Sequence, residues 1–296
     1  MRFWLAPAAA AFFLIASGPA HAEAPRDLRH DTRVDIAVTL TGATWWLTTE
    51  LLKGALVPEK CRWCYRAQDG ASLLNPYDGA VRNALLWEDT RAAHVTSNVV
   101  AFAIEPLSAL GLNVLAASDE DALSNAPLDA LIVAEATVVA GVINQLAKFG
   151  FARERPFVHH LPRAPDAVRA LTDSPSDDNL SFFSGHTTLG FVMATSSGTV
   201  AFMRGYRLAP LVLGSGLVMA TSVGYLRIAA DKHYFSDVMT AAIVGSIIGI
   251  GVPLIFHSPE ASSPSTSAAA LASPAMRTAA LASPAMRTAF SMSGKF

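Results

Sequence analysis

Cations, two histidines and one carboxylate occur in three short blocks of this sequence, and together they could carry out phosphoryl transfer. In chain order they are Lys148 and Arg155, then Ser184, Gly185 and His186, and then Arg227, His233 and Asp237. A phosphoryl group carries negative charge on its non-bridging oxygens, so a site without a metal must meet that charge with cations and oriented N–H donors. The residue types therefore predict an anion site, provided that the three blocks meet in space.

The cations and the start of one helix would hold the anion. Arg155 and Arg227 can each bind two oxygens through a planar guanidinium, while Lys148 acts as a point charge. The Gly185 amide can approach a phosphate closely, because glycine has no side chain and helix N-termini attract anions. The Ser184 hydroxyl can add one more donor.

The two histidines would divide the proton and phosphorus chemistry. One must be neutral to attack phosphorus, and the other must be protonated to donate to the leaving oxygen. Asp237 lies one helical turn after His233 and can accept from its Nδ1–H, which would leave Nε2 free as the nucleophile. His186 is then the expected general acid, and it can later activate the water that hydrolyses the phosphohistidine.

Each block taken singly has a simpler explanation. Lys148 and Arg155 could be solvated cations at a helix end. Ser184 could be only a helix N-cap, and His233 with Asp237 could be an i,i+4 pair on a helix flank. The joint pattern favours phosphoryl transfer, because it contains every group that the metal-free reaction needs.

The spacing of the blocks resembles the three-part signature of the type 2 phosphatidic acid phosphatases and vanadium haloperoxidases. The pattern is Lys148, six residues, Arg155-Pro156, then Phe183-Ser184-Gly185-His186, then Arg227, five residues, His233, three residues and Asp237. Two positions depart from the family pattern. Phe183 stands where the family usually has proline, and Leu226 stands where it usually has serine, which removes a possible phosphate donor.

The resemblance implies a phosphoric ester hydrolase that works through a phosphohistidine on His233, with no metal ion or other cofactor. We expect phosphomonoesters or diphosphates as substrates, above all phosphatidic acid-like or isoprenoid lipids, because the site would lie at the end of an apolar bundle. Two alternatives within enzymes are a non-specific periplasmic acid phosphatase and a haloperoxidase, in which vanadate would be the cofactor in the same pocket. An alternative of another class is a non-catalytic lipid-binding envelope protein.

The rest of the chain predicts an all-α, six-helix apolar bundle. The sequence is 52% hydrophobic and 16% charged, and its long Ala-, Leu-, Val- and Gly-rich segments exceed strand length. These segments are residues 36–57, 95–117, 128–149, 187–204, 208–228 and 237–256. A net charge of −2 without a basic run argues against nucleic acid as a partner.

Residues 1–22 are typical of a signal peptide, with Arg2, an apolar run and a small-x-small cleavage site at 20–22. We therefore expect export to the cell envelope and a mature phosphatase domain over residues 23–257. Export would favour a disulfide between the two cysteines, Cys61 and Cys64, over a zinc or redox site. Residues 258–296 are expected to form a disordered Ala/Ser/Pro tail with a decapeptide repeated in tandem.

The expected topology leaves several arrangements open. The apolar helices indicate a membrane protein or a membrane-associated periplasmic globule. A periplasmic active site would suit the two cysteines, although six spans counted from an external N-terminus would place the site in the cytoplasm. Acids within apolar segments, namely Glu50, Glu105 and Glu135, would each need a partner inside the bundle and weaken a simple spanning model.

Overall fold

The computed structural model describes residues 24–58, 60–67, 69–160 and 175–259. The predicted signal peptide lies outside the described residues. The expected tail, including its tandem repeat, also lies outside them, except for its first two residues. The described residues are helical apart from loops and three isolated β-bridges, which confirms the all-α prediction for this part of the chain.

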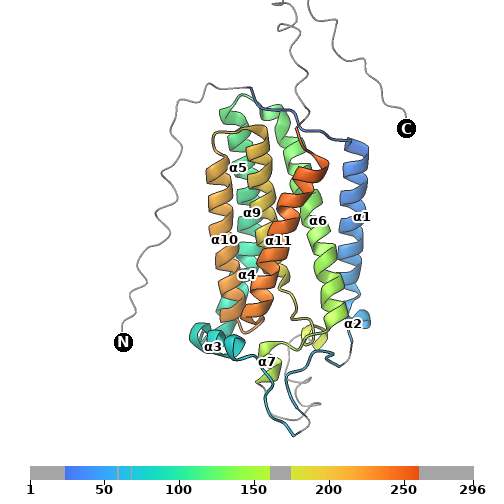
Figure 1. The fold of residues 1–296 in the computed structure, drawn as a ribbon, viewed down its shortest axis with the longest axis vertical. Coiled ribbons are helices and arrows are strands. Elements are labelled where there is room, and N and C mark those ends of the chain that lie inside the picture. The colour runs from blue at the N-terminus through green and yellow to red at the C-terminus, as the bar shows by residue number, and fades with distance from the viewer. Residues whose placement is uncertain (1–23, 59, 68, 161–174, 260–296) are drawn as a thin grey trace, which may run out of the picture. The chain divides into compact units, whose positions relative to one another are not determined.

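The long helices run nearly parallel to one axis (Figure 1). They are α1 (Thr32–Leu51), the continuous run of α4 (Thr90–Val99), the π-helix η1 (Val100–Ile104) and α5 (Glu105–Asp119), then α6 (Ala126–Phe151), α9 (Gly185–Arg204), α10 (Ala209–Ala229) and α11 (Phe235–Phe256). Each expected apolar segment overlaps one of them, although the last six residues of segment 36–57 lie beyond the end of α1. The short helices α2 (Lys53–Leu56), α3 (Pro76–Leu85), α7 (Pro156–His159), η2 (Leu123–Asn125) and η3 (Pro175–Asp177) come in addition, so the described chain has more helices than six.

Helix α9 forms the centre of the bundle, and most of its side chains are buried against α6, α10 and α11. Glycines on its neighbours permit this packing. A Cβ atom at Gly249 of α11 would lie 2.1 Å from Thr195 Oγ1, and one at Gly216 of α10 would lie 2.8 Å from Ala194 Cβ. The small residues therefore allow the helices that carry separate parts of the site to lie close together.

Within the described part of the chain, four helical stretches are long and apolar enough to cross a membrane. They are residues 90–119, 123–151, 209–229 and 235–256. Large apolar side chains point outward from them, for example Leu107, Val218 and Ile247, each more than 60% exposed. A surface of this kind is compatible with membrane association, because exposed apolar patches mark membrane or protein contacts.

The acids within the apolar segments differ in their partners. Glu50 accepts from Lys53 at 2.6 Å near the end of α1, and Glu135 lies 3.1 Å from His257 inside the bundle. Glu105 is buried, and neither of its carboxylate oxygens has a hydrogen-bond partner among the described residues. Of the three acids, Glu135 therefore has a partner inside the bundle, while Glu50 is exposed and paired near a helix end.

A buried ion pair joins α6 to α9. The Arg204 guanidinium donates to Asp129 at 2.8 Å, and the Tyr206 hydroxyl donates to the other Asp129 oxygen at 2.9 Å. Arg204 is 2% exposed and Asp129 is fully buried. A buried charge without its partner is strongly destabilising, so this pair must stay intact.

We predict that Arg204→Ala lowers the free energy of unfolding by about 3–5 kcal/mol, because it leaves the Asp129 carboxylate buried and unpaired. Arg207→Ala is the matched control, since its ion pair with Asp119 is largely exposed and such pairs contribute about 0–1 kcal/mol. Denaturant unfolding of both variants in the same detergent measures the difference. Equal losses would contradict the assignment of Arg204 as a buried structural cation.

Candidate active site

The three sequence blocks meet at one end of the bundle, where α6 ends, α9 begins and α10 turns into α11. Arg155 NH1 lies 3.3 Å from His233 Nε2, which joins the first block to the third. A Cβ at Gly185 would lie 3.1 Å from Lys148 Nζ, which joins the first block to the second. Side chains far apart in the sequence thus face one small volume.

The end of α6 places the two cations of the first block. The helix ends at Phe151, and Ala152 turns the chain in the left-handed region at φ +42°, with its N–H bonded to Lys148 O at 3.0 Å. Arg155 follows, and its guanidinium donates to the carbonyls of Asp177 at 2.6 Å and Lys232 at 2.9 Å. These bonds hold Arg155 beside His233.

The structure gives His233 a different hydrogen-bond partner from the one expected. Its Nδ1 lies 2.8 Å from the Ser181 carbonyl oxygen, whereas the nearest Asp237 oxygen is 3.7 Å away. A carbonyl can only accept, so Nδ1 carries the proton and Nε2 presents its lone pair toward Arg155. The tautomer needed for attack is thus fixed by Ser181, which the sequence did not identify.

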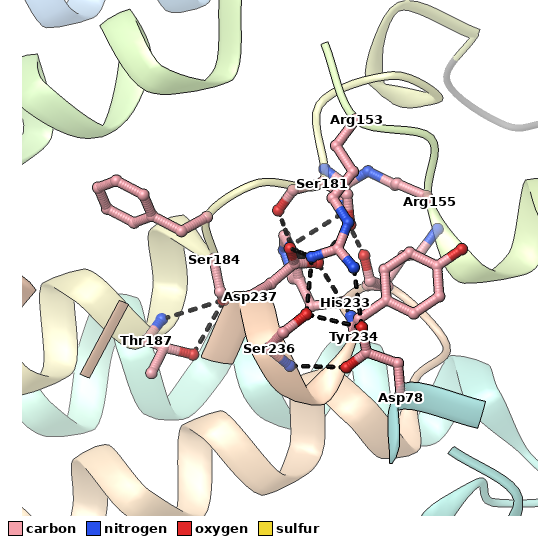
Figure 2. Close-up of polar contacts among 12 residues, drawn as sticks. Asp78, Arg153, Arg155, Ser181, Ser184, Thr187, His233, Tyr234, Ser236 and Asp237 are labelled. Atoms are coloured by element: carbon pink, nitrogen blue, oxygen red, sulfur yellow. Dashed lines mark hydrogen bonds and ion pairs between the residues drawn. The ribbon is translucent and has the colours of Figure 1, made fainter. Parts of the chain in front are cut away.

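Asp237 instead joins a buried network around Arg153 (Figure 2). Its Oδ2 accepts from Ser181 Oγ at 2.5 Å and from the Tyr234 N–H at 3.0 Å, and its Oδ1 accepts from Arg153. Asp237 therefore holds the segment that carries the Ser181 carbonyl. It positions His233 indirectly and adds a negative charge nearby.

Arg153 is the centre of this network. It is 1% exposed and also pairs with Asp78 of α3 at 2.9 Å, while its guanidinium carbon lies 4.4 Å from the ring centroids of Trp63 and Tyr234. Aromatic faces attract a desolvated guanidinium. In the sequence Arg153 cannot be told from a solvated cation near a helix end, because its partners come from distant segments.

The segment between α2 and α4 packs beside the first block. Cys61 and Cys64 form a disulfide with their Cα atoms 5.5 Å apart. The Arg62 N–H donates to the Ala152 carbonyl at 3.1 Å, and the Glu154 N–H donates to the Trp63 carbonyl at 3.1 Å. The cysteine loop thus supports the turn that carries Arg153 and Arg155.

Helix α4 contributes polar side chains for which the sequence had indicated no role. Arg227 NH1 lies 2.9 Å from His94 Nδ1 and donates to Ser97 Oγ at 3.0 Å. His186 Nε2 lies 2.7 Å from Asn98 Oδ1, so Nε2 carries a proton that it donates to the amide oxygen. The partners of Arg227 and His186 therefore lie one helical turn apart on one face of α4.

Ser184 of the second block is the N-cap of α9, as one interpretation of the sequence predicts. Ser184 Oγ accepts from the Thr187 N–H at 3.4 Å and from the Thr187 hydroxyl at 2.9 Å. Its own hydroxyl proton can still point to an anion. The Phe183 carbonyl accepts from Asn144 at 2.8 Å, and Leu226 packs in an apolar cluster beneath the third block. The two departures from the family pattern thus occupy packed, structural positions.

The site is strongly positive before an anion binds. Burial lowers the pKa of His233 well below its usual value, and the positive charges of Arg155, Arg227 and Lys148 lower it further. Burial and the same three cations also lower the pKa of His186. Both imidazoles are therefore neutral near pH 7, and a bound anion would favour protonation of His186.

We predict that His186 and His233 together make the ligand-free protein less stable as the pH falls below about 6.5, the ordinary pKa of histidine. The unfolded chain binds protons in that range, while His186 and His233 stay neutral in the folded state, so acid favours unfolding. Thermal unfolding between pH 7.5 and 5 measures this effect.

The His186→Gln, His233→Gln double variant should flatten the slope of this pH profile, and added inorganic phosphate should reduce it in the parent protein. A pH profile that is identical with and without phosphate would contradict the proposed electrostatics.

Comparison with known proteins relates this site to one protein family. No curated protein and no solved structure matched the chain. Residues 129–260 match the family model described as the PAP2 superfamily. The match covers α6, α9, α10 and α11, which carry all three blocks of the site. Residues 129–260, which include the whole three-part site, are therefore similar to the PAP2 superfamily.

Proposed function

We propose that this chain hydrolyses phosphomonoesters or diphosphates of membrane lipids through a phosphohistidine on His233, without a metal ion in the reaction. The match of residues 129–260 to the PAP2 superfamily supports a phosphoric ester hydrolase. The observation that carries the mechanism is the geometry of His233. Its Nδ1–H is held by the Ser181 carbonyl, and its free Nε2 lies beside the Arg155 guanidinium.

The first step transfers the phosphoryl group to the protein. His233 Nε2 attacks phosphorus, the bond from phosphorus to the ester oxygen breaks, and its electron pair leaves on that oxygen. His186 donates the proton that makes the leaving group an alcohol. Because Nε2 of His186 donates to Asn98, the transferred proton is carried on Nδ1. Lys148, Arg155 and Arg227 stabilise the charge on the other oxygens.

The second step returns the protein to its starting state. His186, now neutral, accepts a proton from water as the water oxygen attacks phosphorus. The bond between phosphorus and Nε2 breaks, its electron pair returns to His233, and inorganic phosphate leaves. Arg153 and Asp237 act as positioning residues in both steps, because they hold Ser181 against Nδ1.

An apolar groove beside His186 supports a lipid substrate. The groove, of ≈ 440 Å³, runs between α1, α5, α6 and α9 and is lined by residues that include Trp46, Phe102, Leu110, Ala134 and Met193. The Phe102 ring packs edge-on against the His186 ring with centroids 4.7 Å apart. A lipid tail in the groove would therefore place its phosphate at His186.

The location of the disulfide supports a site that faces the periplasm. The cysteine loop packs on the turn that carries Arg155, so the loop and the phosphate site share one end of the bundle. Disulfides persist in oxidising compartments. We therefore assign this end of the bundle to the outer side of the inner membrane.

We predict that rapid quenching in alkali traps a phosphoryl group on the protein during turnover of a labelled lipid phosphate, whereas quenching in acid does not. Phosphohistidine is stable in base and labile in acid, unlike a phosphoserine or a phosphoaspartate. His233→Ala should abolish the label and lower the rate of phosphate release by roughly 10³-fold or more.

His186→Ala retains the nucleophile, so it should lower the rate while still giving label with a substrate that has a good leaving group. Release of phosphate should persist in EDTA at a temperature where the protein stays folded. Strict dependence on added vanadate or on a divalent metal would contradict the proposal.

We predict that filling the groove separates lipid from soluble substrates. Ala134→Trp should lower kcat/KM for a long-chain lipid phosphate by about 10-fold or more, because the tail loses buried apolar contact. Turnover of a short soluble phosphoester should stay within about twofold, which also shows that the variant folds.

The matched control for Ala134→Trp is Ile143→Trp, since Ile143 is exposed on the same helix and does not line the groove. Equal effects of Ala134→Trp on both substrates, or equal effects of the two variants on the lipid, would contradict the assignment of the groove.

A further inference from the structure

Three buried side chains of types that can ligate metals come together at the opposite end of the bundle from the phosphate site. They are Asp35 in the first turn of α1, Glu135 on α6, and His257 directly after α11. One ligand atom from each lies within 4.8 Å of the other two. Glu135 is 13 residues before Lys148 on α6, so the two sites are separated by roughly 20 Å along that helix.

The hydrogen bonds of His257 prepare one ring nitrogen as a ligand. Its Nδ1 lies 3.1 Å from the Arg29 carbonyl oxygen, which can only accept, so Nδ1 carries a proton. Its Nε2 faces the Glu135 carboxylate at 3.1 Å. A histidine that donates one N–H to a carbonyl while the other nitrogen faces inward is the usual arrangement at a metal site.

Asp35 supplies the second observation. It is 6% exposed, and its Oδ2 atom is buried with no hydrogen-bond partner among the described residues. A buried carboxylate oxygen without a partner is costly unless a cation or a donor reaches it. Together, Asp35 and Glu135 place two carboxylates beside one imidazole inside the bundle, and that charge calls for a cation.

We propose that Asp35, Glu135 and His257 bind one divalent first-row transition metal ion, with zinc as the first candidate. Two carboxylate oxygens and one imidazole nitrogen suit zinc or manganese, and water can complete the coordination. Magnesium fits less well, because it favours oxygen ligands and rarely takes imidazole.

The ion would tie the N-terminal and C-terminal parts of the described domain together. The segment before α1 already packs on the end of α11, since Arg29 donates to the carbonyls of Phe256 at 3.4 Å and Ile255 at 3.2 Å. An ion held by α1, α6 and the residue after α11 would lock this contact. The role is structural and separate from phosphoryl transfer, so it does not depend on the proposed function.

The test measures metal binding to the purified, tag-free protein after removal of metals. Titration calorimetry with zinc should give one site, and cobalt added in place of zinc should show visible d–d absorption. Saturating zinc should raise Tm by about 5 °C or more, because a ligand that binds only the folded state stabilises it.

Asp35→Asn and His257→Gln should each weaken zinc binding by at least 10-fold and remove the shift in Tm. Glu135→Gln is a second, nearly isosteric variant, which keeps the test decisive if one of the others fails to fold. The control is His30→Gln, since His30 is exposed near the site and lies outside the three-residue cluster; zinc binding should be unchanged.

The proposal is overturned if folded parent protein binds neither zinc nor manganese. It is also overturned if binding survives in the Asp35 and His257 variants but is lost in His30→Gln. Turnover measured in parallel, in EDTA and below the Tm of the metal-free protein, separates a loss of fold from a loss of chemistry.

Discussion

The site depends on one electrostatic constraint, which is the concentration of positive charge around His186 and His233. Lys148, Arg155 and Arg227 all act on the two histidines, and burial strengthens the effect by excluding water. The Asp177 and Lys232 carbonyls accept from Arg155, and the Ser97 hydroxyl accepts from Arg227. Such a site holds its cations ready for an anion and keeps both imidazoles neutral until the anion arrives.

A second layer of buried groups keeps this pocket in shape. Arg153 is paired with Asp78 and Asp237 and packed among aromatic rings, so it joins α3, the turn after α6 and the start of α11. Through Asp237 and Ser181 it reaches the imidazole of His233. A buried network with this many hydrogen bonds and ion pairs favours a single arrangement of the nucleophile.

Much of this site could be predicted from the sequence, because each block is short and its spacing is local. Lys148, Arg155, Gly185, Arg227 and His233 do lie together, and long apolar segments gave the helices that carry them. The count of six helices was not confirmed, since the described chain adds short helices such as α3, which follow local caps within polar stretches.

Contacts between distant segments could not be predicted. The sequence around Arg153 does not distinguish it from a solvated arginine. Likewise, no sequence feature shows that the Ser181 carbonyl, and not Asp237, accepts the hydrogen bond from His233. Asn98 lies 88 residues before its partner His186. Asp35, Glu135 and His257 show no sequence spacing that would indicate a site, because they come together only when the two ends of the domain meet.

The most direct test of the central claim is an experimental structure with vanadate bound. The account predicts one anion contacted by Lys148, Arg155 and Arg227, with His233 Nε2 on one side of the vanadium and His186 on the other. An anion bound elsewhere, or a bound anion that His186 and His233 do not flank, would contradict it.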